Sequence, residues 1–494
     1  MRTCLMLHVC SNQINMASSP PKPKRLRRSP SYGQPRLDGD LLVDEVLTRL
    51  PIAAAVRLRA VCREWNAALT SDHFVRAHSA RAAAAARQPE LLFFAPGAGK
   101  GISTSFYACS LRDGEAPTAA RELLTIDYIS ANRTVMSPTP CRGLTLIFNT
   151  RAPEYYLLNL STGDHVVLPP CQRAEVLDGL LLRLPCGRTS YFPARPPWSP
   201  FELSTTGLGF DTATGEHKVV RLFKKRNWDH TCEVYTPGRA PGGWRPCVGR
   251  VPACAANFVP ALPPVFVDGY LYWLLPPAGR REEPTHRILS FSVGAEQFGW
   301  VHVPTGLSTM MCHLANLDGL LCAVVDNRLF GDVYALFTWS GRSSASASWS
   351  VRCSINLRSL PQQVSDELGE ERVVVPLCSA AGGKVLLATG RHKVFAYDAE
   401  SNTVERVFRM QEFVDVPDDA LTARLLLGVG LHEERIADVR HGAGGERRLD
   451  VKLGRCDNVV AKREVPADIK YDDDGKMTVF FKHLAELGPP HLNM

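Results

Sequence analysis

The sequence lacks the features that would place it in a membrane or outside the cell. No stretch of the 494 residues approaches the roughly 18 uninterrupted apolar positions of a membrane span, so we expect no membrane partner. The fifteen cysteines are scattered and no two form a Cys-x-x-Cys pair, which indicates reduced thiols rather than a disulfide framework. The first residues are a poor secretory signal, because His8 interrupts their short apolar piece. We therefore expect the protein in the cytoplasm, the nucleus or both.

Motifs for catalysis are also missing. Gly97–Gly101 is rich in glycine but lacks the spacing of a phosphate-binding loop. In His432–Ile436, isoleucine stands where a zinc protease has its second histidine ligand. The acidic turn Asp472–Gly475 lacks the first ligand and the final glutamate of a calcium loop. We predict that the protein is not an enzyme and has no catalytic residue, metal or cofactor. An enzyme with a dispersed active site is the remaining alternative.

The folded part of the chain has little net charge. The whole sequence carries 57 Lys and Arg against 50 Asp and Glu, a balance of +7. Residues 1–40 hold seven basic and two acidic side chains, a balance of +5, which leaves +2 for the remainder. A nucleic-acid-binding core would show a basic face, so we expect no nucleic-acid partner.

Residues 1–36 are predicted to be a disordered basic and proline-rich tail, because they cannot bury enough apolar surface to offset chain entropy. The basic run is either a nuclear import signal or a solubilising segment. Met16 is a plausible alternative translation start.

Residues 37–87 carry the spacing of short amphipathic helices. The apolar positions of the first helix fall at i, i+3, i+4 and i+7, namely Val43, Val46, Leu47 and Leu50. Pro51 ends this helix, because proline disfavours the helical conformation at the residue before it. The two following helices carry Val56 and Leu58, then Val61, Trp65 and Leu69. Three short helices bury little surface, so this unit needs a partner or the next domain.

From residue 90 onward the pattern changes to short strands between Gly, Pro, Asp and Asn turns. Four hydrophobic runs directly follow a glycine, at Gly143, Gly269, Gly319 and Gly383. An irregular repeat near 50 residues is typical of propeller blades, and residues 90–410 leave room for about six of them. We predict an all-β, kelch-like propeller domain there. Residues 411–494 are a C-terminal extension that either completes the last blade or frays. The alternative is a pair of β-sandwiches.

The helical region contains three segments with a recognisable order. Leu37–Pro51, Val56–Trp65 and Phe74–His78 together resemble the F-box of plant F-box proteins. The Leu50-Pro51 break and the Val-Cys-Arg-x-Trp pattern that ends at Trp65 are the most specific features. Asp38 stands where this family usually has proline.

Six segments of the β region form a recognisable series along the chain: Gly207–Asp211, Lys218–Phe223, Cys232–Tyr235, Pro264–Trp273, Ile288–Phe291 and Leu317–Cys322. Through them the β region resembles the F-box-associated interaction domains of grass proteins. Their order along the chain agrees with that family.

The resemblance implies a substrate-recognition subunit of an SCF-type (Skp–cullin–F-box) ubiquitin ligase. The helices would bind a Skp-type adaptor and, through it, a cullin, and the β domain would hold a protein target. The alternative is an interaction or scaffold protein whose F-box is weakened by Asp38.

The F-box resemblance and the spacing of apolar residues together indicate candidate residues for binding an adaptor and a target. The apolar positions of the helical unit are the adaptor-binding candidates, because a small unit with more apolar surface than it can bury is typical of a partner-binding element. They are Leu37, Leu41, Leu42, Val46, Leu47, Leu50, Pro51, Val56, Leu58, Val61 and Trp65. About half must instead form the internal core of the unit. One polar and aromatic loop is the target-binding candidate, with Arg226, Trp228, Asp229 and His230.

Overall fold

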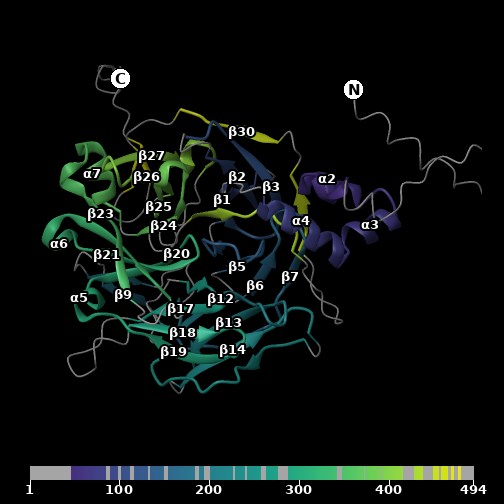
Figure 1. Ribbon diagram of the computed structural model, residues 1–494, viewed down its shortest axis with the longest axis horizontal. Coiled ribbons are helices and arrows are strands. Elements are labelled where there is room, and N and C mark those ends of the chain that lie inside the picture. The colour runs from purple at the N-terminus through teal and green to yellow at the C-terminus, as the bar shows by residue number, and fades with distance from the viewer. Residues whose placement is uncertain are drawn as a thin grey trace, which may run out of the picture.

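Short hydrophobic strands form six antiparallel blades around a common axis in the described part of the computed structural model (Figure 1). The structure describes residues 46–84, 90–97, 102–111, 116–131, 134–149, 154–177, 179–183, 189–193, 201–225, 229–239, 242–256, 263–275, 287–341, 348–371, 373–390, 392–415, 428–437, 449–454, 458–464, 469–471 and 477–479. The predicted propeller is confirmed, and the β-sandwich alternative is wrong.

Five blades are four-stranded and follow one another along the chain. Blade 1 contains β4 (Thr134–Met136), β5 (Thr145–Asn149), β6 (Glu154–Leu158) and β7 (His165–Val167). Blade 2 contains β12 (Ser204–Asp211), β13 (Glu216–Lys224), β14 (His230–Tyr235) and β15 (Arg245–Pro246). Blade 3 contains β16 (Val265–Val267), β17 (Tyr270–Leu274), β18 (Ile288–Ser292) and β19 (Gln297–Val301).

Blades 4 and 5 have the same simple up-and-down order. Blade 4 contains β20 (Met311–Leu317), β21 (Leu320–Asp326), β22 (Val333–Trp339) and β23 (Trp349–Asn356). Blade 5 contains β24 (Val374–Ser379), β25 (Val385–Thr389), β26 (Lys393–Asp398) and β27 (Thr403–Arg409). Each of the hydrophobic runs singled out in the sequence forms a strand in one of these sheets or in the sheet described next.

The remaining sheet, the closing blade, combines distant parts of the chain. β1 (Glu90–Pro96), β2 (Ser103–Ser110) and β3 (Ala119–Asp127) pair in sequence order. β28 (Val429–His432) pairs antiparallel with β1, so that Glu90 faces His432 and Phe93 faces Val429. β29 (Val451–Leu453) and β30 (Val459–Ala461) pair with the other edge of β3. This pairing closes the ring and covers sheet edges that would otherwise be exposed.

Turn chemistry explains the recurring glycines of the sequence. In blades 3 and 4 the first two strands are joined by two residues with positive φ, Asp268–Gly269 and Asp318–Gly319. The longer connections in blades 1 and 5 contain the positive-φ pairs Arg142–Gly143 and Gly382–Gly383. Two successive positive φ values define the type I′ turn, whose twist matches that of the flanking strands. In blade 2 the first two strands are joined by residues 212–215, and Gly215, directly before β13, also has a positive φ of 72°.

Hydrophobic clusters fill the junctions between neighbouring blades. Among the described residues, each of the six junctions has its own cluster. At the junction of the closing blade with blade 5, Phe93 packs against Phe408 with ring centroids 5.2 Å apart. The core is therefore a ring of interfaces around the channel rather than one central mass.

A helical unit precedes the propeller. It contains the 3₁₀ helix η1 (Leu47–Arg49) and the helices α2 (Ile52–Leu58), α3 (Arg63–Leu69) and α4 (Asp72–Ala84). Leu50 has φ −74° and ψ 144°, an extended conformation before Pro51, so the helix ends where the sequence predicts. Val46 lies in a turn and residues 47–49 are 3₁₀, which differs from the α-helix predicted there.

Shorter elements complete the described structure. They are the hairpin strands β8 (Val176–Leu177), β9 (Gly179–Arg183), β10 (Thr189–Pro193), β11 (Phe201–Glu202), β31 (Ile469–Tyr471) and β32 (Met477–Val479). The short helices are α5 (Thr305–Ser308), α6 (Arg328–Gly331), α7 (Gln362–Gly369), η3 (Leu357–Ser359), η4 (Ala381–Gly383) and η5 (Met410–Glu412). Among all the residues that the structure describes, no helix is long and apolar enough to cross a membrane. The proposed domain boundaries stay predictions.

Candidate functional site

The helical unit has a small core of its own. Leu47, Ile52, Leu69 and Phe74 are each at most 1 % exposed and pack together. His78 Nε2 lies 3.1 Å from the carbonyl oxygen of Leu50, which ties α4 to the end of η1. These contacts hold the short helices in one arrangement.

The predicted adaptor-binding residues divide between this core and the surface. Leu47 is buried, whereas Val46, Leu50, Val56, Leu58 and Trp65 are half-buried and Pro51 and Val61 are exposed. Leu37, Leu41 and Leu42 lie outside the described residues. Val61 lies in the turn before α3 rather than on its face, and 51 % of its surface is exposed. The exposed and half-buried apolar side chains are those available to a partner.

Trp65 has both a core contact and an exposed part. It is half-buried and packs against the helical core, and its backbone N–H donates to Cys62 Sγ at 3.4 Å, which caps the start of α3. Tryptophan of this kind is frequent at interface hot spots, because one part of the ring can pack inside while the rest meets a partner.

The helical unit is joined to the propeller by both apolar and ionic contacts. Ile436, which follows β28, is part of the helical core at 2 % exposure. Arg59 forms an ion pair with Asp164 of blade 1 at 3.1 Å and donates to the carbonyl oxygen of Leu69 at 3.4 Å. Figure 1 places α2, α3 and α4 together at one side of the ring. A partner bound to the helices would thus be held at a defined side of the propeller.

The predicted target loop is only partly described. Arg226 and Trp228 lie outside the described residues. Asp229 is exposed, and its carbonyl oxygen accepts from the Lys225 N–H at 3.0 Å. His230 Nδ1 accepts from the Ala256 N–H at 2.8 Å. Burial lowers the pKa of His230, and the nearby Lys224 lowers it further, so the ring is a neutral acceptor that anchors a neighbouring loop. Target binding at this loop stays a prediction.

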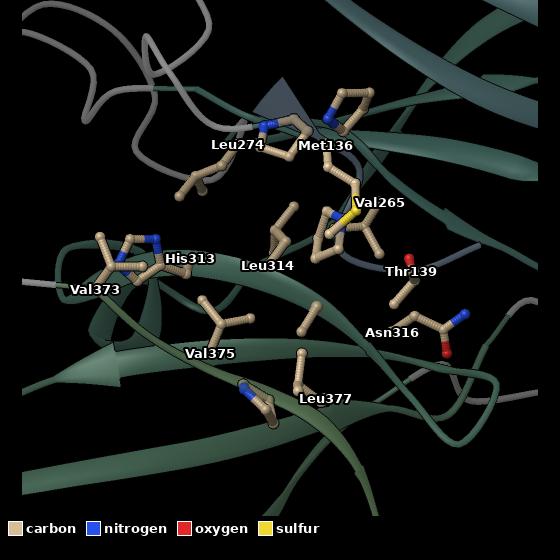
Figure 2. Close-up of a pocket in the computed structure, with 15 residues that line it drawn as sticks. Met136, Thr139, Val265, Leu274, His313, Leu314, Asn316, Val373, Val375 and Leu377 are labelled. Carbon is tan, nitrogen blue, oxygen red and sulfur yellow. The ribbon is translucent and has the colours of Figure 1, made fainter. Parts of the chain in front are cut away.

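A cavity on the propeller axis was not indicated by the sequence. It has a volume of about 50 Å³ and lies among the inner strands of blades 1, 3, 4 and 5 (Figure 2). The lining residues are Met136, Pro138, Thr139, Pro263, Pro264, Val265, Leu274, His313, Leu314, Ala315, Asn316, Val373, Val375, Pro376 and Leu377. They come from segments far apart in the chain, which explains why no local pattern revealed the site.

Close packing beside this cavity explains the glycines of the Gly-Leu-Gly-Phe-Asp segment. A Cβ atom on Gly207 would collide with Pro264, a cavity residue. A Cβ atom on Gly209 would lie 2.6 Å from a methyl group of Val293. Because only glycine lets β12 approach blade 3 this closely, these two residues help to position the cavity wall.

The same segment ends in a buried ionic cluster that joins blades 2 and 3. Lys218 Nζ lies 3.3 Å from Asp211 and 3.2 Å from Glu296. The Nη1 atom of Arg245 also donates to Glu296 at 2.8 Å. The two buried carboxylates, Asp211 and Glu296, are thus paired with two cations, Lys218 and Arg245. Burial alone would raise the pKa of Glu296, but hydrogen bonds from Arg245 and Lys218 lower it.

One arrangement at the ring closure has the order of a hydrolase triad. Ser161 Oγ lies 3.2 Å from His432 Nε2, and His432 Nδ1 lies 2.9 Å from Glu90 Oε2. These bonds tie β28 to β1 and to blade 1, and the axial cavity is lined by other residues. A catalytic triad also needs a substrate cleft and an oxyanion site. We therefore interpret these hydrogen bonds as structural contacts that stabilise the closure of the ring.

Metal-ligating side chains and cysteine thiols are two further kinds of candidate group within the described residues. No cluster of three or more His, Cys, Asp or Glu side chains that could hold a metal occurs within the described residues. Burial raises the pKa of the Cys141 and Cys322 thiols to about 12, which makes them poor nucleophiles.

Comparison with known proteins gives a consistent family match. Residues 105–425 match the model of the "F-box associated beta propeller domain". The chain is 24 % identical over 401 residues to F-box protein At3g07870 of Arabidopsis thaliana, which covers 74 % of this chain and 86 % of that one. It is 26 % identical over 342 residues to F-box/LRR-repeat/kelch-repeat protein At1g09650 of Arabidopsis thaliana, covering 64 % and 76 %. A chain of the nidogen/laminin complex aligns with a TM-score of 0.35 and 12 % identity, over 71 % of this chain and 100 % of that one.

Proposed function

The chain belongs to the family of proteins with an F-box associated β-propeller domain, and we propose that it is the substrate-recognition subunit of an SCF-type ubiquitin ligase. Its relatives include F-box proteins of Arabidopsis thaliana. We further propose that it is a grass-type member of the family, on the resemblance of its β-region segments alone. The observation that carries the proposal is the order of its parts. A short helical unit with exposed apolar side chains precedes a propeller that matches the family.

In this proposal residues 37–87 are an F-box that binds a Skp-type adaptor and, through it, a cullin. Pro51 and Val61 offer the exposed apolar surface, and Trp65 contributes from its half-buried position. The propeller, over residues 90–410, holds the protein target, and residues 411–494 form the C-terminal extension. We propose that the protein works in the cytoplasm, the nucleus or both.

The proposed role involves no bond chemistry by this chain. A receptor that holds a target near a ubiquitin-loaded enzyme raises the effective concentration of the reacting groups, which accelerates transfer without a catalytic residue of its own. The contacts of Arg59 and Ile436 support this role, because they fix the helical unit on the ring.

Co-purification with a Skp-type adaptor tests the proposal. The wild-type chain should co-purify with the adaptor, and the double variant Leu50→Ala, Pro51→Ala should lose it. Because Leu50 also packs against the helical core, thermal unfolding of the variant must be measured in parallel. Absence of wild-type binding at micromolar concentration would refute the proposal. Adaptor binding without ubiquitin transfer in an assembled cullin complex would favour the scaffold alternative.

A further inference from the structure

We infer that the axial cavity binds one aliphatic side chain of an uncharged segment of the target protein. The inference rests on the proposed function, since it specifies the chemistry of the target that the propeller holds. The cavity lies among inner strands from four blades, so strands of four different sheets hold its walls in place. A rigid, preformed pocket loses little freedom when it is filled.

The composition of the wall restricts the occupant to uncharged groups. None of the fifteen lining residues is Asp, Glu, Lys or Arg, and most are aliphatic or proline. Figure 2 shows carbon atoms around most of the space, with polar atoms at Thr139, His313 and Asn316. Asn316 is already engaged, because it donates to the Phe266 carbonyl oxygen at 3.0 Å and accepts from the Gly319 N–H at 2.9 Å. A charged group would therefore be buried here without a counter-charge, at high cost.

The size of the cavity separates a side chain from a small-molecule ligand. Its volume of about 50 Å³ is far below the roughly 300–1,000 Å³ of small-molecule sites. It is also smaller than the roughly 150 Å³ cavity that accepts benzene. The branched end of a leucine, isoleucine or valine is the size of group that it admits.

The rim of the cavity is formed by half-buried residues and is held in place by the ring closure. Pro138, Thr139 and Pro263 are half-buried, whereas Leu274, Ala315 and Leu377 deeper in the wall are buried. The Pro138 carbonyl oxygen accepts from the Leu431 N–H at 2.8 Å, so the rim is fixed to β28 and to the ring closure. One anchoring side chain in a fixed pocket, with weaker contacts around it, is the usual arrangement of a protein interface hot spot.

Selection of peptides on the full-length chain tests the inference. A displayed library of linear 12-residue peptides is selected on the wild type, and the affinities of synthetic copies are measured by fluorescence anisotropy. We expect the selected peptides to share one aliphatic residue with uncharged neighbours. Thr139→Phe, which fills the rim, should weaken their binding at least tenfold. The control Val351→Phe, at a position on β23 that is 61 % exposed, should leave binding unchanged.

A size-swap variant provides a second test that does not depend on losing binding. Leu314→Ala enlarges the cavity and should shift the preferred anchor from an aliphatic residue to phenylalanine. The inference would be overturned if peptides bound Thr139→Phe and the wild type equally, or if their shared anchor were a charged residue. It would also be overturned if the cavity bound benzene without any peptide, or if no peptide were selected. Adaptor affinity, measured on the same preparations, reports on the proposed function separately.

Discussion

At the scale of single residues, Glu296 shows how a turn residue can stabilise a junction between blades. Its side chain is 4 % exposed and accepts hydrogen bonds from Lys218 of β13 and Arg245 of β15. Lys218 and Glu296 are 78 positions apart in the sequence, and the sequence of the turn does not predict their contact. Sequence reasoning identified the segments, but their pairing depends on the tertiary packing of two blades.

We predict that Glu296→Gln lowers the free energy of unfolding by about 3 kcal/mol, because it leaves the buried Lys218 with reduced counter-charge. The measurement is urea unfolding at pH 7. The matched control is Asp332→Asn, which removes an exposed ion pair with Arg358 and should cost less than about 1 kcal/mol. Equal effects of the two substitutions would contradict the role of the buried cluster.

The same cluster predicts a dependence of stability on pH. The folded-state pKa of Glu296 lies below its ordinary value of 4.5, so its stabilising effect is present above that value. The effect is lost as the pH falls through 4.5 toward the folded pKa. The wild type should therefore lose more of its free energy of unfolding than Glu296→Gln as the pH falls from about 5 to about 3, the range in which carboxylates usually titrate. Parallel curves for the two proteins would contradict this assignment.

We predict that Cys247 reacts with iodoacetamide faster than Cys322 in the native protein at pH 7. A hydrogen bond with Cys232 lowers the pKa of the half-buried Cys247 thiol, whereas burial raises that of Cys322 to about 12. More thiolate at neutral pH gives faster alkylation. Peptide mass spectrometry over a time course measures both rates, and faster labelling of Cys322 would contradict the prediction.

At the scale of elements, the strands and turns of the blades could be predicted from the sequence. The closure of the ring by the pairing of β28 with β1 could not. Asp268–Gly269 and Asp318–Gly319 reveal their turns because positive φ has a local chemical signature. β28 has no such signature, since its partner β1 lies more than three hundred residues earlier. The axial cavity escaped prediction for the same reason, because four blades contribute its walls.

We predict that Gly430→Ala weakens the ring closure. A Cβ atom at this position would lie 2.5 Å from the Pro138 carbonyl oxygen, which is backbone and cannot move aside easily. The expected loss is about 1–3 kcal/mol in the free energy of unfolding, typical of overpacking. The control Gly306→Ala lies in α5 with open space around its Cβ and should be nearly neutral. Hydrogen exchange of β28 measures the local effect, and unchanged protection would contradict it.

At the scale of the whole molecule, a small helical unit is fixed to one side of a six-bladed ring. From the nearly neutral charge of the chain beyond residue 40 we predict protein partners rather than nucleic acid. The ion pair of Arg59 with Asp164 and the packing of Ile436 connect the two parts. In the proposed function, the adaptor and the target are therefore held at separate places on the chain.

The affinity of the full-length chain for a purified Skp-type adaptor, measured by calorimetry, tests the proposed function most directly. We predict micromolar or tighter binding by the wild type and at least tenfold weaker binding by Val61→Glu, which places a charge on an exposed apolar position of the helical unit. Val351→Glu, on the exposed face of β23, should bind as the wild type does. No binding by the wild type, or equal binding by both variants, would contradict adaptor docking through these helices.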